Sequence, residues 1–255
     1  MKRFIAAVLC AILALAPASA GQMSLLGAGK AGGGSVGPPT LTFVSTLGLT
    51  DAGANKTLTG AAIGSAVSTR QLFMVITGNG VGLLPTSLTF TPNAGAPVPA
   101  TLVNGSNVGD ARYVFIYQAN VPTGTTTDAT LAFPSNPFSN FNYALYYADG
   151  AQMNSTTATD SQRTSGTSGT SSLTVNLNAS AGGFILAGAS YGATTNPTTT
   201  WTGGETYTTR TDATGNGMRV SFADASGITG GATDAVTATW SLSASNVVLI
   251  AATWR

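Results

Sequence analysis

The sequence predicts an all-β fold, built as a sandwich or barrel of many short strands. Short apolar or alternating runs are separated by clusters of Gly, Asn, Pro and Asp, which mark turns. Threonine, valine and aromatic residues, which favour pleated surfaces, fill these runs. No stretch after residue 20 repeats apolar residues at the spacing of an amphipathic helix.

The N-terminal segment has the three-part pattern of a secretory signal peptide, residues 1–20. Lys2 and Arg3 precede an apolar run, and Ala18-Ser19-Ala20 offers the small residues that signal peptidase requires. The run is shorter than the ~20 apolar residues of a membrane-spanning helix, so we expect cleavage after Ala20 and no span afterwards. Translation that starts at Met23 is the alternative.

Residues 21–39 are rich in glycine and end in two prolines, which predicts a flexible linker. We expect residues 40–255 to form a single β-sandwich domain. Strict alternation at Leu173, Val175 and Leu177 predicts a strand with one wet face. The apolar runs 72–76 and 246–254 predict central strands that are buried on both faces.

The segment 151–172 is polar and of low complexity, and it is expected to be a loop between the two halves of the chain. Because loops carry function disproportionately, a binding role for it is the alternative to a plain connection.

The composition argues against several classes of chemistry. The chain has no histidine, and its one cysteine, Cys10, lies in the signal peptide, so no disulfide, thiolate metal site or histidine base is expected. Charged residues make up 7% of the chain, which does not suit a nucleic-acid binder. Oxygen-rich turns at 104–110 and 211–217 match no recognised calcium loop, so neither a metal nor another cofactor is predicted.

Five motifs stand out in the chain: "VPTGTTTDATLAF" (121–133), "SSLTVNLNASAGGFILAGASYG" (171–192), "TTTWTGGETYTTRTD" (198–212), "GNGMRVSFAD" (215–224) and "VTATWSLSASNVVLIAATWR" (236–255). They resemble motifs of phage and prophage-type virion accessory proteins, associated with tails or heads, and of related bacterial surface proteins. The resemblance covers about residues 58–255, and it implies a jelly-roll-like antiparallel sandwich displayed on a particle. A signal peptide departs from this pattern, since virion proteins assemble in the cytoplasm.

Two groups of residues are candidate ligand contacts. Trp201, Glu205 and Tyr207 could stack on and hydrogen-bond a sugar, because aromatic faces are apolar and a carboxylate binds hydroxyls. Tyr143 and Tyr147 share one face of an expected strand and could form a partner surface. For both groups, packing in the core is the favoured alternative.

Hydrolysis of a glycoside needs two facing carboxylates. Glu205, Asp212, Asp224 and Asp234 are the candidates in the second half, and the sequence singles out no pair.

The expected function is therefore a non-enzymatic structural or adhesive display module on a cell surface or phage particle. A carbohydrate-binding module that uses Trp201 and Tyr207 is the alternative, and a glycoside hydrolase is the third. The expected partners are a protein or glycan on a surface or particle, with no nucleic acid. The expected location is secreted or on the cell surface, or in the virion if translation starts at Met23.

Overall fold

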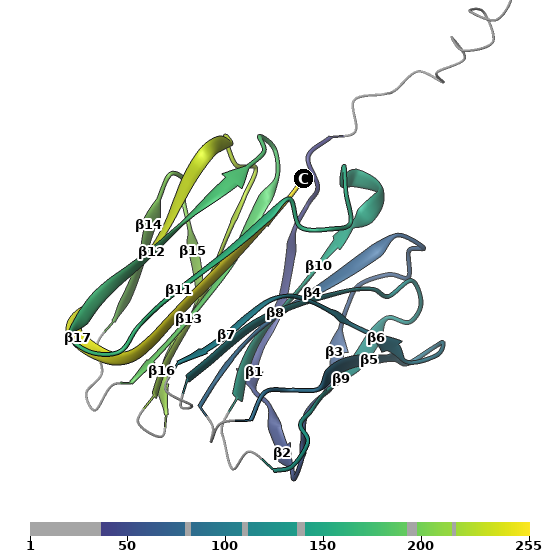
Figure 1. Ribbon diagram of the computed structural model, residues 1–255. Coiled ribbons are helices and arrows are strands. Elements are labelled where there is room, and N and C mark those ends of the chain that lie inside the picture. The colour runs from purple at the N-terminus through teal and green to yellow at the C-terminus, as the bar shows by residue number, and fades with distance from the viewer. Residues whose placement is uncertain (1–36, 80–82, 109–111, 137–140, 193–197, 216–217) are drawn as a thin grey trace, which may run out of the picture. The chain divides into compact units, whose positions relative to one another are not determined.

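A computed structural model describes residues 37–79, 83–108, 112–136, 141–192, 198–215 and 218–255 (Figure 1). The expected signal peptide and all but the last residues of the expected linker lie outside these ranges. The described residues form antiparallel sheets, which confirms the all-β sandwich class. The one helical element among them is a single 3-10 turn, η1 (Gly150–Gln152). The described part of the chain thus contains no helix with the length and hydropathy to cross a membrane.

The first half of the chain builds two sheets that face one another. Sheet A has the order β1-β10-β4-β8-β7, and sheet B has the order β2-β3-β9-β5-β6. The strands of sheet A are β1 (Thr42–Gly48), β4 (Arg70–Gly78), β7 (Thr101–Val108), β8 (Arg112–Asn120) and β10 (Phe141–Asp149). Those of sheet B are β2 (Thr50–Ala52), β3 (Asn55–Ala62), β5 (Ser87–Pro92), β6 (Val98–Pro99) and β9 (Thr126–Ala132).

The second half builds sheet C, of order β11-β17-β13-β16-β15, to which β12 and β14 are joined through β17. The N-terminal part of the long strand β17 pairs with β12 and β14, and its C-terminal part pairs with β11 and β13, so one strand serves two layers. The strands are β11 (Asp160–Gly166), β12 (Thr170–Ala179), β13 (Phe184–Gly192), β14 (Thr199–Gly203), β15 (Thr208–Gly215), β16 (Met218–Ser226) and β17 (Gly231–Trp254).

The two halves have the same strand order. In the first half, β1-β10-β4-β8 face β3-β9-β5-β6, which is the arrangement of a jelly roll. The second half repeats both layers. Its first layer consists of β11, the C-terminal part of β17, β13 and β16. Its second layer consists of β12, the N-terminal part of β17 and β14. In each half a large aromatic residue lies opposite an alanine in the second layer, Phe90 opposite Ala129 and Trp201 opposite Ala238. The chain is therefore two jelly-roll-like sandwiches in tandem.

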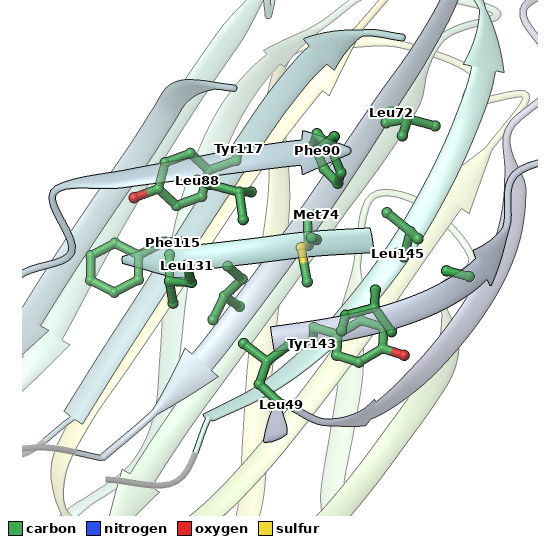
Figure 2. Packing of buried hydrophobic residues seen from close by; sticks show 14 of the residues in the cluster. Leu49, Leu72, Met74, Leu88, Phe90, Phe115, Tyr117, Leu131, Tyr143 and Leu145 are labelled. Atoms are coloured by element: carbon green, nitrogen blue, oxygen red, sulfur yellow. The ribbon is translucent and has the colours of Figure 1, made fainter. Parts of the chain in front are cut away.

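Each sandwich has its own core. Between sheets A and B, Leu72, Met74 and Leu145 meet Leu88 and Phe90, and Figure 2 shows these side chains together. A second core lies within the C-terminal sandwich, where Val175 of β12 and Val236 of β17 pack in one cluster with Ile185 of β13.

A third core joins sheet A to sheet C. Phe73 and Val75 leave β4 on the face opposite Leu72 and Met74, and they pack in one cluster with Phe184 and Trp254. Phe184 and Trp254 are stacked with ring centroids 5.3 Å apart, and Phe73 meets Trp254 edge-on at 4.8 Å. The apolar runs 72–76 and 246–254 are thus central strands buried on both faces, as the sequence predicts.

A polar contact fixes the same interface near β1. Arg210 of β15 forms an ion pair with Asp224 of β16 and lies 4.8 Å from the ring centroid of Phe43. The Phe43 ring meets Tyr146 edge-on at 5.5 Å. Burial, with the charge of Asp224 as a second cause, raises the pKa of the Tyr146 phenol well above its ordinary value.

The described residues from 37 to 255 belong to one compact unit, and this unit holds two sandwiches, because strands with two apolar faces allow a second pair of layers to pack on the first. One expectation needs correction. The segment 151–172 is not a continuous loop, since residues 160–166 form β11 and pair with β17 from Asp160 to Gly166. This edge strand depends on backbone hydrogen bonds and has no buried side chain, so its composition gives no strand signal.

Candidate functional site

The structure does not present Trp201 to a ligand. Its side chain is buried in the core of the C-terminal sandwich, 7% exposed, and its indole Nε1 donates a hydrogen bond to Ser221 Oγ at 2.8 Å. A buried indole usually satisfies its N–H in this way. Trp201 therefore takes the core role, and the predicted sugar platform at Trp201 is wrong.

Glu205 and Tyr207 lie in the connection from β14 to β15, where they hold other loops in place. Glu205 Oε1 accepts hydrogen bonds from Thr229 N and Thr229 Oγ1, each 2.7 Å, and so fixes the β16–β17 turn. The Tyr207 ring is half-buried against the core, and its hydroxyl donates to Ala235 O at 3.4 Å. Burial, followed by the charges of Asp234 and Glu205, raises the pKa of the Tyr207 phenol.

Asp234 lies near these residues and is 8% exposed. Its Oδ2 atom is buried without a hydrogen-bond partner, and burial together with the charge of Glu205 raises the pKa of the carboxyl group. Among the described residues, no three acidic or cysteine side chains gather as a metal-binding group would require.

Tyr143 and Tyr147 also face inward. Tyr143 is 2% exposed and belongs to the N-terminal core, where Figure 2 shows it beside Leu49. Its hydroxyl lies 3.3 Å from Ser45 Oγ. Tyr147 packs on the same core, whereas Tyr146 belongs to the interface core, so the predicted alternation of faces is confirmed. The structure therefore gives these tyrosines a packing role.

The other candidate carboxylates serve the fold. Asp212 forms an ion pair with Arg219, whose Nε lies 2.7 Å from Asp212 Oδ1, and it also accepts a hydrogen bond from Thr199 N at 2.9 Å. Asp224 forms an ion pair with Arg210, whose Nη2 lies 3.0 Å from Asp224 Oδ2. Hydrogen bonding to Asp212 raises the pKa of Arg219, and hydrogen bonding to Asp224 raises the pKa of Arg210.

A groove of about 440 Å³ lies beside β7 and β8, where the segment after η1 passes over them. Its floor holds two buried amides, Gln71 and Gln118. Gln118 Nε2 donates to Gln71 Oε1 at 3.2 Å and to Thr156 O, while Gln118 Oε1 accepts from Trp254 Nε1 at 2.9 Å. The groove is thus built on the interface between the sandwiches. Its other lining residues are Thr101, Leu102, Val103, Ala119, Asn120, Thr157, Ala158 and Ser161.

A second hollow of about 460 Å³ continues on the other side of Leu102, which lines both. Its lining includes Leu84, Pro85 and Tyr117. Arg163 of β11 borders it and donates a hydrogen bond to Gly105 O of β7. Burial raises the pKa of Tyr117 to about 12, so this phenol is a neutral hydrogen-bonding group at physiological pH.

Amide and hydroxyl groups around an aliphatic surface suit an uncharged, hydroxyl-rich ligand. None of the residues that line the first groove carries a charge, so the groove offers hydrogen-bond donors and acceptors without an acid or base to drive hydrolysis. Leu102, which lines the first groove, is 49% exposed and offers an apolar contact there, and Leu84, which is 52% exposed, offers one in the second hollow.

Sequence reasoning missed this groove because its residues come from four separate segments of the chain. The one available signal was the segment 151–172, for which a binding role was considered. Thr156, Thr157 and Ser161 of that segment line the first groove, and Arg163 and Ser165 line the second hollow. Gln71 and Gln118 gave a weaker signal, as polar residues beside apolar runs.

Comparison with protein-family models, with curated proteins and with solved structures finds no match to this chain. The assignment of function therefore depends on the geometry described above.

Proposed function

We propose that this protein is a non-enzymatic adhesive display module, which holds a glycan-binding groove on the surface of a cell or particle. The observation that carries the proposal is the groove itself. It is uncharged, lined by amides and hydroxyls, and supported by the interface of two sandwiches.

The tandem architecture supports a display role. The two sandwiches are joined by the ring contacts of Phe73 with Phe184 and Trp254 and by the contact of Arg210 with the Phe43 ring, so a force on one is transmitted to the other. With charged residues at only 7% of the chain, little on the surface titrates or is screened by salt. Both properties suit a protein that works outside the cell.

A glycan array tests the ligand class. We expect binding of neutral oligosaccharides with millimolar or tighter Kd, and a loss of at least about tenfold in Thr157→Trp, because the indole would fill the groove. Thr200→Trp is the matched control, since it places the same side chain at an exposed position of β14. Absence of any glycan ligand, or an equal loss in both variants, would refute the groove assignment.

The site of display is tested separately by mass spectrometry of the native N-terminus. Gly21 as the first residue indicates export and display on the cell surface, the location that we propose. Met23 or Ser24 as the first residue would contradict export and favour a virion component.

A further inference from the structure

The described part of the chain contains one lysine, Lys56 of β3, which is the only lysine after residue 30. It is 1% exposed, although lysine side chains are almost never fully buried unless they are paired. Its ammonium group lies 3.4 Å from Gly53 O and 3.4 Å from Asn136 Oδ1. The lysine is thus directed at a side-chain amide that lies 80 residues away in the sequence.

The backbone fixes both partners of this contact. Lys56 lies opposite Leu131 in the β3–β9 ladder, and Phe133 N donates a hydrogen bond to Ala54 O at 2.9 Å. These bonds hold the segment that follows β9 against the start of β3, and Asn136 lies three residues beyond Phe133. Because a C=O bond is about 1.23 Å long, Lys56 Nζ lies within about 4.6 Å of the Asn136 amide carbon.

From this arrangement we propose that Lys56 and Asn136 form an intramolecular isopeptide bond. Lys56 Nζ bonds to Cγ of Asn136, the Cγ–Nδ2 bond breaks, and the nitrogen departs as ammonium with the protons that the lysine gives up. The reaction consumes no oxidant and no second molecule. Because the fold already holds the lysine nitrogen beside the amide, the reaction does not carry the entropy cost of bringing the two groups together.

Two features favour this reaction over its competitors. Burial of Lys56 excludes water, which would otherwise hydrolyse the amide. Pro137 follows Asn136 in the sequence and has no backbone N–H, so Asn136 cannot cyclise onto the next peptide nitrogen. The product ties β3 to the β9–β10 connection in a protein whose only cysteine is Cys10.

Mass spectrometry of the purified protein tests the proposal. We expect an intact mass about 17 Da below the mass calculated for the chain from its observed first residue, corresponding to one lost ammonia. Trypsin should leave Lys56 uncut and yield a branched peptide that joins residues 31–70 to residues 113–163. The full sequence mass together with cleavage after Lys56 would overturn the proposal.

Three variants identify the source of the mass loss. Lys56→Arg and Asn136→Ala should each restore the full mass, whereas Lys30→Arg should keep the deficit. A deficit that persists in Lys56→Arg would mean cyclisation of another asparagine and would also overturn the proposal.

Discussion

Single buried residues hold the turns of the N-terminal sandwich, and Arg70 is the clearest case. It is 2% exposed, and its guanidinium donates hydrogen bonds to backbone carbonyls on both sides of it. The acceptors are the carbonyl oxygens of Ile63, Gly64, Ser65, Val121, Thr123 and Gly124. One side chain thus joins the β3–β4 and β8–β9 connections.

We expect Arg70→Met to lower the free energy of unfolding by about 3–5 kcal/mol, because buried carbonyls lose their donors while the volume is roughly kept. Urea denaturation measures the change. Arg163→Met is the control, since Arg163 is exposed, and it should change stability by less than about 1 kcal/mol. Equal effects of the two substitutions would contradict the role given to Arg70.

The ionised carboxyl groups of two aspartates should have opposite effects on the stability of the fold: that of Asp234 lowers it, and that of Asp149 raises it. The pKa of Asp234 is raised by burial and by Glu205, so its ionised form destabilises the folded state as pH rises above its unfolded pKa. The pKa of Asp149 is lowered by hydrogen bonds from Thr69 and from Ala151 N, so its contribution is present at neutral pH and is lost as pH falls.

Near pH 7, therefore, Asp234→Asn should raise Tm by a few degrees and Asp149→Asn should lower it. Both differences should shrink toward about pH 3, where the carboxyl groups of the folded and unfolded states become protonated. Thermal melts across this range test the pair. A pH-independent difference for either variant would assign its effect to packing instead of charge.

At the scale of the strand, β17 is the element that makes the C-terminal sandwich possible. It leaves the layer of β12 after Ala244 and enters the layer of β13 at Ser245. Asn246, next in the chain, has a φ of 49°, in the left-handed region that asparagine tolerates better than other side chains. Its backbone N–H donates to Thr167 O at 3.1 Å.

Asn246→Val should therefore cost about 1–2 kcal/mol, because a β-branched residue is strained in this region, whereas Asn246→Gly should be close to neutral. The difference in urea midpoint between the two variants is the measurement. If valine is tolerated as well as glycine, the bend does not depend on this backbone conformation.

The elements also show how far sequence reasoning reaches. The alternation of apolar and polar residues predicted β12 correctly, because Val175 and Leu177 are buried in the structure and their neighbours are exposed. The same method missed β11, whose side chains make no core, and it could not decide whether Trp201 faces a core or a ligand. That choice depends on Ser221 of β16, which the fold brings to Trp201 from 20 residues away. The groove around Gln118 could not be predicted either, because its lining residues are brought together only by the fold.

At the scale of the whole molecule, the interface core should make the two sandwiches unfold together. Trp254 stacks on Phe184, meets Phe73 and donates to Gln118. We expect a single calorimetric transition for the wild type. Trp254→Ala should lose about 3–5 kcal/mol and separate the transition into two, because the cavity falls between the sandwiches.

Leu242→Ala is the control for this experiment, since Leu242 lies on the same strand and is 50% exposed. It should leave a single transition with nearly unchanged Tm. Two resolved transitions in the wild type would show that the interface does not couple the halves.

Because each half forms its own sheets, the protein can be divided between them. No strand of sheets A and B comes from beyond β10, and no strand of sheet C comes from before β11. A cut in the connection between Asn154 and Thr159 therefore leaves two polypeptides that each keep all of their strand-pairing partners. Produced separately and mixed, they should reassociate through the faces that carry Phe73 and Phe184, whose rings meet in the core between the sandwiches.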